Sequence, residues 1–360
     1  MAYISFQPTD FFKTLRYIGN GSATSAHVYP ATTAMQPGMF LVKDISGTYP
    51  FMLMDSVRGA TKYLYTAANN QEATSSTRLK SFDSDGFTIG DDNTINLNAN
   101  NFASWSWKAG TTSGISGGTI TPTGYSVNTT SGVGIYAYAG TGSNGTIAHG
   151  LSSAPQMVIC KRIAGDTGDW NTWHKDLGGG TYYINLNTSS AKTSNAAVWN
   201  STVPSDTLVS LGTYAAVNAS GSDYVMYAFS EVKGFSSFGV YTGNGNADGA
   251  FVYTGFQPEL IIAKNRDSGG LAAYGWSMIS NTFGMTGSTN ANPSYNELTQ
   301  NLFVDQDVVP GTGNAVDFLS NGFKWRSTGT GGNQSGSPFI YAAFAKQPLV
   351  SSNSKAGVAR

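Results

Sequence analysis

The 360-residue sequence predicts an all-β protein built from three tandem antiparallel β-sandwich, jelly-roll-like modules. Two observations favour this fold. Short apolar and aromatic runs alternate with turns rich in glycine, which supplies 44 residues, while patterns typical of long helices are scarce. In addition, one set of motifs occurs three times in the same order, roughly 100 to 120 residues apart, which is long enough for each copy to be a small domain.

Each copy of the repeat opens with a tyrosine and a glycine turn, at 17–21, 138–142 and 241–245. Asn-Gly pairs in or just after these turns, at 20–21, 144–145 and 244–245, predict the positive φ angles of tight hairpins. An apolar run then separates a proline from a lysine six positions later: Pro37 and Lys43, Pro155 and Lys161, Pro258 and Lys264. These runs predict short buried strands.

Each copy closes on a segment in which large and small side chains alternate, at 102–107, 224–229 and 339–344. Alternation at period two predicts a strand with one buried face. We therefore expect Trp105 and Trp107 to be core residues. Cys160, the one cysteine of the chain, is predicted to be a small buried apolar residue.

The repeat divides the chain into β modules at 13–109, 131–234 and 235–346. An N-terminal attachment segment, 1–12, precedes them, and a flexible tail, 347–360, follows. Residues 110–130 form a linker of Gly, Thr and Ser without periodicity, which predicts a loose connection between the first two modules. We expect the modules to be strung in order and a protease to cut first within this linker.

The low charge of the chain argues against several classes of partner. Only 11% of the residues are charged and the net charge is -1, so no long-range field attracts nucleic acid or an anionic membrane. The sequence contains no run of 18 apolar residues, the length that a helix needs to cross a bilayer, so no membrane insertion is expected. The first residues lack the pattern of a signal peptide.

Motifs that carry catalytic chemistry lack the context that they need. Gly140–Gly145 matches the dinucleotide-binding pattern and Gly114–Gly118 the nucleophile elbow, but no helix pattern follows either. The three histidines are far apart, which gives no zinc spacing, and Asp83–Gly86 is interpreted as a turn rather than a calcium loop. We expect no catalytic residues, no metal and no cofactor, and a protein that is not an enzyme. Glycoside hydrolysis by two carboxylates stays open as an alternative.

One cluster of aromatic and polar residues suits a sugar surface. Trp170, Trp173 and His174 are candidate glycan contacts, because an indole ring stacks on sugar C–H groups while polar neighbours bind hydroxyls. The competing interpretation is a core strand with buried tryptophans. It is favoured, because Trp276 recurs at a similar place in the third copy.

Four aromatic residues precede the first repeat: Tyr3, Phe6, Phe11 and Phe12. Aromatic side chains dominate interface anchors because they bury a large area with few rotatable bonds. These residues are therefore candidates for attaching the chain to a larger particle. Packing on the first module is the alternative.

Several of these motifs together resemble a repeated β-domain of tailed-bacteriophage virion proteins, a family that is common in marine and cyanobacterial phages and is labelled tail fibre or minor structural protein. The segments that carry the resemblance, besides the glycine turns, are Asp55–Leu64, Ser81–Phe87, Ser104–Gly110, Gly255–Pro258 and Lys264–Arg266. It covers about residues 3 to 348. The first copy departs from the pattern at Ala34–Pro37, and the third lacks the tryptophan of the closing strand.

The resemblance implies a non-enzymatic structural protein of the phage virion, synthesised in the host cytoplasm. A tail fibre or appendage that mediates host-surface attachment is the first expectation. The alternatives are a decoration or fibre protein of the capsid or neck, and a carbohydrate-degrading enzyme like a tailspike. The implied partners are other virion proteins, a host surface glycan, and further copies of the chain in a homo-oligomer, with a trimer favoured by analogy.

Overall fold

The computed structural model describes residues 4–30, 33–283, 297–312 and 315–350, and its regular structure is nearly all β. Strands account for 44% of the residues and helices for 6%, so the all-β prediction is confirmed. Every strand pair in the described residues is antiparallel. The helices are single turns.

The strands pair within three successive stretches, which we call unit 1 (12–108), unit 2 (124–230) and unit 3 (236–348), and each stretch forms one large and one small sheet. The large sheet of unit 1 has the order β1 (Phe12–Ile18), β9 (Asn101–Lys108), β3 (Pro37–Asp44), β4 (Met52–Asp55), β5 (Lys62–Tyr65), β6 (Ala73–Thr74). Its small sheet has the order β2 (Ser25–Val28), β8 (Gly86–Ile89), β7 (Leu79–Asp83).

Units 2 and 3 are arranged in a similar way. The large sheet of unit 2 is β10 (Gly124–Asn128), β11 (Val133–Ala139), β18 (Asp223–Ser230), β13 (Pro155–Ala164), β14 (Asn171–His174), β15 (Tyr182–Asn185), β16 (Thr193–Ser194); the small one is β12 (Gly145–Ala148), β17 (Leu208–Leu211). The large sheet of unit 3 is β19 (Ser236–Thr242), β27 (Pro338–Pro348), β21 (Phe256–Asn265), β22 (Ser277–Ser280), β24 (Leu302–Phe303); the small one is β20 (Phe251–Tyr253), β26 (Gly322–Trp325), β25 (Val316–Leu319), β23 (Glu297–Leu298).

The six single-turn helices lie between the strands or before the first one. They are η1 (Pro8–Asp10), α1 (Asn93–Asn96), η2 (Lys175–Leu177), α2 (Ala196–Trp199), α3 (Ala215–Asn218) and η3 (Ala272–Tyr274).

The closing segment of each repeat is an interior strand of its large sheet, as β9, β18 and β27, with a strand paired on each side. The tyrosine of each opening turn stacks across to this strand, with ring centroids 5.2, 5.2 and 5.3 Å apart in the pairs Tyr17–Phe102, Tyr138–Tyr224 and Tyr241–Phe339. The predicted single buried face is wrong, because β9, β18 and β27 are buried on both faces. One face packs on the unit's own small sheet, and the other packs on the neighbouring units.

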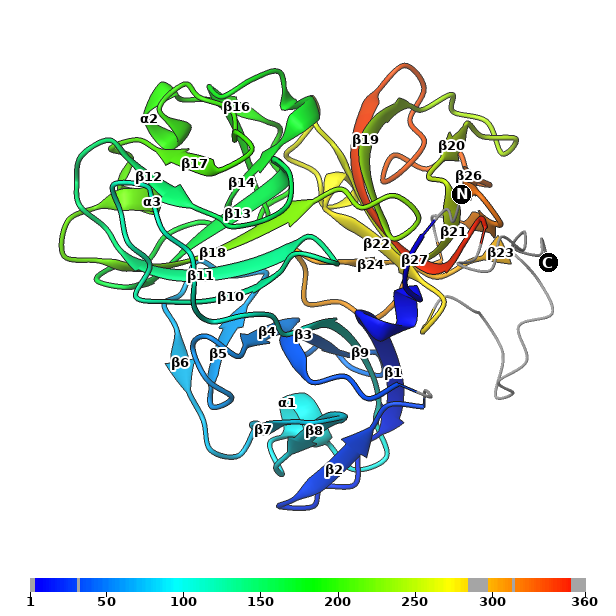
Figure 1. Ribbon diagram of the computed structural model, residues 1–360. Helices are drawn as coiled ribbons and strands as arrows, with labels where there is room; N and C mark the ends of the chain where they lie inside the picture. The colour runs from blue at the N-terminus through cyan, green and yellow to red at the C-terminus, as the bar shows by residue number, and fades with distance from the viewer. Residues whose placement is uncertain (1–3, 31–32, 284–296, 313–314, 351–360) are drawn as a thin grey trace.

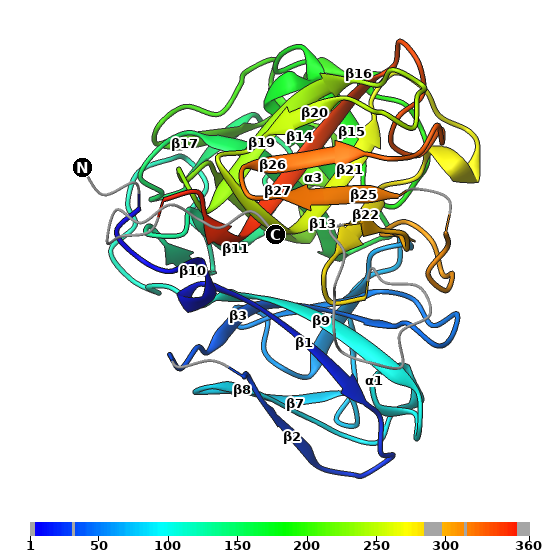
Figure 2. The same ribbon diagram turned by 90° about the vertical axis from the view of Figure 1, so that its right-hand side faces the viewer.

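The three large sheets share one central core. A single buried cluster contains Trp105 and Trp107 of unit 1, Phe229 of unit 2 and Phe344 of unit 3. Figure 1 shows the units as three lobes around this centre, and Figure 2 shows β1 and β9 below the strands of unit 3. The expectation of modules strung in order is therefore wrong, because apolar faces that would otherwise meet water are buried against one another.

An apolar cavity of about 70 Å³ lies in the central core. All three units line it at equivalent positions, with Leu41, Ile159 and Ile262 on β3, β13 and β21, and Thr66, Leu186 and Val304 directly after β5, β15 and β24. The threefold sequence repeat thus appears in space as an approximate threefold arrangement within one chain.

The segment predicted as a flexible linker, 110–130, is part of the fold. It contains β10, which covers the edge of β11, and Thr111 pairs with Val127 while Gly118 pairs with Ile147. Glycine is required for this packing at Gly110, where a Cβ atom would lie 2.0 Å from the backbone of Val127. The composition was misleading because glycine here permits close approach rather than flexibility.

The glycine turns have the predicted backbone conformation in two of the three repeats. Gly21 and Gly245 have positive φ angles of 61° and 65°. In the second repeat the positive φ of 73° belongs to Gly142, while Gly145 begins β12. The dinucleotide-like motif therefore leads into a strand, as the hairpin interpretation predicted.

Candidate functional site

The residues predicted as glycan contacts are buried. Trp170, Trp173 and His174 are 0%, 4% and 1% exposed. The Trp170 indole N–H donates to the carbonyls of Tyr65 and Ala68 in unit 1, at 3.2 and 3.0 Å. These side chains cannot stack on a sugar, so this site prediction is wrong and the competing core interpretation is confirmed, as it is for Trp105 and Trp107.

The aromatic N-terminal segment also packs inside the fold. Phe12 begins β1, is 2% exposed and contacts Trp107 and Phe344, with ring centroids 4.9 and 5.5 Å away. Phe6 packs on Phe11 and on Phe235 of unit 3. These aromatic residues extend the central core, so they are not an exposed anchor; Tyr3 lies outside the described residues.

Equivalent residues at the ends of β4, β14 and β22 connect each unit to the next. Three bonds form the set: the Tyr227 hydroxyl donates to Asp55 at 2.7 Å, the His174 Nε2–H to the Tyr341 carbonyl at 3.1 Å, and the Trp105 indole N–H to Ser280 at 3.0 Å. Asp55, His174 and Ser280 pair with Met39, Met157 and Leu260, each of which lies two positions after the proline of its repeat. The contacts join unit 1 to 2, unit 2 to 3 and unit 3 to 1, so they close a ring.

His174 has a structural role in this ring. Its Nδ1 accepts the backbone N–H of Asp176 at 3.2 Å while its Nε2 donates across the seam. Burial lowers the pKa of the imidazole to about 3. The imidazole of His174 is therefore neutral near pH 7, and the tautomer with its proton on Nε2 makes both hydrogen bonds.

The lysines of the repeat form a second equivalent set. Lys43, Lys161 and Lys264 are fully buried, and each ammonium group donates to three backbone carbonyls. The acceptors of Lys161 include Asn69 of unit 1, and those of Lys264 include Ser189 of unit 2. Burial lowers the pKa of each lysine to about 8. The spacing from proline was visible in the sequence, but this role was not.

Three buried asparagines hold the glycine turns, and the sequence analysis missed them. The Oδ1 atoms of Asn96, Asn218 and Asn333 accept backbone N–H groups of the turns at 2.8, 2.8 and 3.0 Å. Each asparagine lies five positions before the first residue of its closing strand, at Asn101, Asp223 and Pro338. That constant spacing is the signal that could have identified them.

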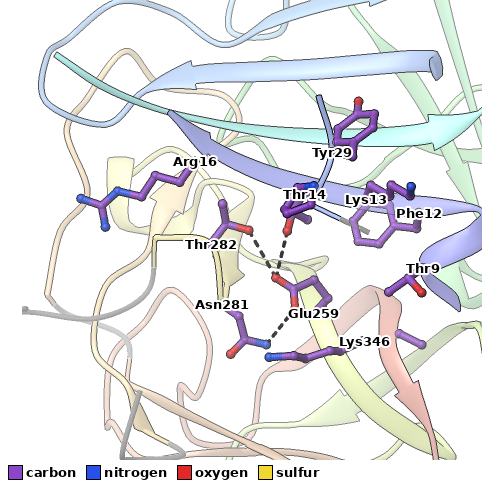
Figure 3. Close-up of a pocket in the computed structure, with 12 residues that line it drawn as sticks. Thr9, Phe12, Lys13, Thr14, Arg16, Tyr29, Glu259, Asn281, Thr282 and Lys346 are labelled. Carbon is purple, nitrogen blue, oxygen red and sulfur yellow. Dashed lines mark hydrogen bonds between the residues drawn. The ribbon is translucent and has the colours of Figure 1, made fainter. Parts of the chain in front are cut away.

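The seam between units 3 and 1 contains a pocket of about 380 Å³ (Figure 3). Its lining comprises Thr9, Phe12, Lys13, Thr14, Arg16, Tyr29, Pro30, Glu259, Asn281, Thr282, Ala345 and Lys346. The Glu259 carboxylate occupies its centre and accepts from the hydroxyls of Thr14 and Thr282, each at 3.3 Å, and from the Asn281 amide at 3.2 Å. Glu259 is the one carboxylate among the residues that line this pocket.

Cations outnumber anions around this pocket. Lys13, Arg16 and Lys346 line it together with Glu259. Lys13 is engaged by Asp85 at 3.5 Å, while Arg16 donates to the Asn101 amide oxygen at 3.2 Å. Burial raises the pKa of Glu259, and the nearby positive charge of Lys346 opposes that rise.

The pocket occupies a position that apolar residues fill in the other two seams. Thr14 is equivalent to Ile135 and Phe238, since the three lie opposite Trp105, Tyr227 and Ala342. Ile135 and Phe238 are both buried in the central core.

Glu259 also differs from its equivalents in the other units. It lies at the irregularity that follows the repeated proline, where the other two units have Gly38 and Gln156. At this seam Thr14 and Glu259 thus stand where the other two seams have an apolar residue and a glycine or a glutamine.

Three further features bear on other kinds of site: the cysteine, clusters of metal-binding side chains and long apolar helices. Burial raises the pKa of the Cys160 thiol to about 12, which makes it unreactive. Across the parts of the chain that the structure describes, no group of three or more His, Cys, Asp or Glu residues is placed to hold a metal ion. The described helices include none that is long and apolar enough to cross a membrane.

Comparison with known proteins gives one match. No curated protein and no solved structure matches the chain. A family model described as a domain of unknown function (DUF7483) matches residues 7–348, a range that begins at η1 and ends with β27. Because the match includes all three units, the chain belongs to the DUF7483 family.

Proposed function

We propose that the chain is a non-enzymatic structural protein of a tailed-phage virion, and that it forms part of a tail fibre or similar appendage that contacts the host surface. The resemblance of its repeats to phage virion domains supports a place in the virion. The observation that carries the structural role is the closed ring, in which equivalent positions of the three repeats bind one unit to another. These positions therefore serve to hold the three units in one body.

The seam pocket supports a binding role over a hydrolytic one. Glycosidases that use two carboxylates require a second acid within about 5 to 10 Å of the first. The lining of the pocket supplies Glu259 alone, and its two oxygens already accept three hydrogen bonds. This arrangement favours recognition of a polar ligand.

We also propose association with other virion proteins and with further copies of the chain. A homo-oligomer is expected because a repeat of about 100 residues is only marginally stable alone, and a trimer is favoured by analogy with the phage family. Contacts between the three units already stabilise each repeat within one chain, so a trimer would have to be held together by further contacts between chains. Sedimentation measures this directly, since a trimer has three times the 37.9 kDa of the chain.

Electron microscopy of intact particles tests the location. Gold-labelled antibodies raised against the purified chain should decorate the tail or its appendages. Label on the capsid or neck would replace the proposal with a decoration protein, and the absence of label from purified particles would overturn the virion assignment. Release of oligosaccharide from host capsule or lipopolysaccharide by the purified chain would overturn the non-enzymatic role.

A further inference from the structure

We propose that the pocket between units 3 and 1 binds an anionic saccharide, with Glu259, Thr14, Thr282 and Asn281 facing its hydroxyls and Lys346 facing its acidic group (Figure 3). The inference deepens the proposed host-surface role and rests on it for the source of the ligand, a surface polysaccharide. Binding by the purified chain does not depend on the virion, so the two proposals can fail separately.

The divergence of this seam from its equivalents is the first argument. Ile135 and Phe238 fill the equivalent positions and contribute to the central core. Thr14 at this seam gives up the apolar burial that the equivalent residues provide at both other seams. A hollow with a polar lining is thus a departure from a pattern that the same chain follows twice.

The hydrogen-bonding capacity of Glu259 is the second argument. An ionised carboxylate offers about four acceptor positions. Thr14, Thr282 and Asn281 occupy three of them in the described structure. One position is left for a ligand O–H, and the hydroxyls of Thr14 and Thr282 can accept in turn. Such cooperative donor–acceptor sets suit a ligand that carries several hydroxyl groups.

Charge is the third argument, and it selects an acidic ligand. Lys13, Arg16 and Lys346 against Glu259 leave an excess of positive charge around the hollow. Lys13 is engaged by Asp85 and Arg16 donates to Asn101, so Lys346, beside Glu259, is the cation placed to meet a ligand carboxylate or phosphate. The volume of about 380 Å³ is within the range of small-ligand sites.

Methyl NMR of the intact chain, labelled at threonine methyl groups, tests the inference directly, because Thr14 and Thr282 report on the pocket. The probes are D-glucuronate, D-glucose 6-phosphate, D-glucose and inorganic phosphate, each titrated to about 10 mM, a range suited to weak sites. We expect both acidic sugars to shift these two methyl signals, and glucose and phosphate to bind at least about tenfold more weakly. A response to glucuronate alone or to the phosphosugar alone identifies the acidic group and supports the proposal.

Variants separate the site from non-specific charge. Lys346→Met should weaken binding of the acidic sugars about tenfold and leave glucose unchanged, and Lys346→Arg should restore part of it. Lys80→Met, at an exposed lysine elsewhere on unit 1, is the matched control and should have no effect.

Four results would overturn the inference. They are no shift of the Thr14 and Thr282 signals with either acidic sugar, phosphate binding as well as the sugars, unchanged binding by the Lys346→Met variant with its fold intact, and tighter binding of a glutamate-rich hexapeptide at the same methyl groups. The last result would assign the pocket between units 3 and 1 to an acidic peptide instead.

Discussion

Raising the pH from 7 to 9 should increase the free energy of unfolding, because three buried lysines carry a charge that folding disfavours. Lys43, Lys161 and Lys264 are fully buried, and their pKa falls to about 8 from the ordinary value of 10.5. Between these two pH values the unfolded chain binds more protons than the folded chain. Stability rises with pH wherever the unfolded state holds the extra protons.

The size of the effect follows from the two pKa values. Moving from pH 7 to pH 9 relieves about 1 kcal/mol of the cost of each lysine, or about 3 kcal/mol for the set. The lysine cost is present in full below pH 8 and disappears above 10.5. Cys160 acts in the opposite direction, since its pKa is raised to about 12, and for this reason the measurement should stop at pH 9.

Urea unfolding followed by tryptophan fluorescence at pH 7, 8 and 9 measures the change. The Lys161→Met variant should lose about one third of the rise, while Lys80→Met, at an exposed position, should keep all of it. Stability that is flat or falls across this range in the wild-type chain would refute the reasoning. So would a Lys161→Met variant with the same rise as the wild-type chain.

Three further predictions concern the shared core, the contacts between units and the segment that follows unit 1. Trp107→Ala should cost about 3 to 5 kcal/mol, because it empties space in the core shared by all units, and unfolding should stay a single transition; separate transitions would mean that the units are independent. His174→Phe should cost about 2 kcal/mol by removing its bonds to Tyr341 and Asp176, and an unchanged melting profile would contradict its place in the ring. Limited proteolysis should spare 111–128, because β10 and the Thr111–Val127 pair hold that stretch; early cuts there, mapped by mass spectrometry, would restore the linker interpretation.

The sequence was sufficient for the features that repeat with constant chemistry. Glycine turns, the proline-to-lysine runs and the alternating strands depend on local backbone and burial requirements, so each copy shows them, and together they predicted the all-β class. The ring was harder to predict, because its equivalent positions differ in chemistry. Asp55, His174 and Ser280 share a place and a role but no side-chain type.

The pocket could not be predicted for a related reason. Thr14 belongs to unit 1 and Glu259 and Lys346 to unit 3, so these residues meet only because unit 3 packs on unit 1. The glycan prediction at Trp170 and Trp173 failed because aromatic and polar residues side by side also describe a strand whose indole N–H groups bond to backbone carbonyls inside the fold. Burial decides between the two cases, and burial here depends on a neighbouring unit.

Closure of the ring has a consequence for synthesis on the ribosome. The indole of Trp105 cannot form its hydrogen bond until Ser280, which is 175 residues further along the chain, has been synthesised. At about 5 to 20 residues per second, roughly 10 to 35 s pass between the two. During that interval the large sheet of unit 1 exposes one apolar face in the nascent chain, so this protein should bind chaperones until its last strand is made.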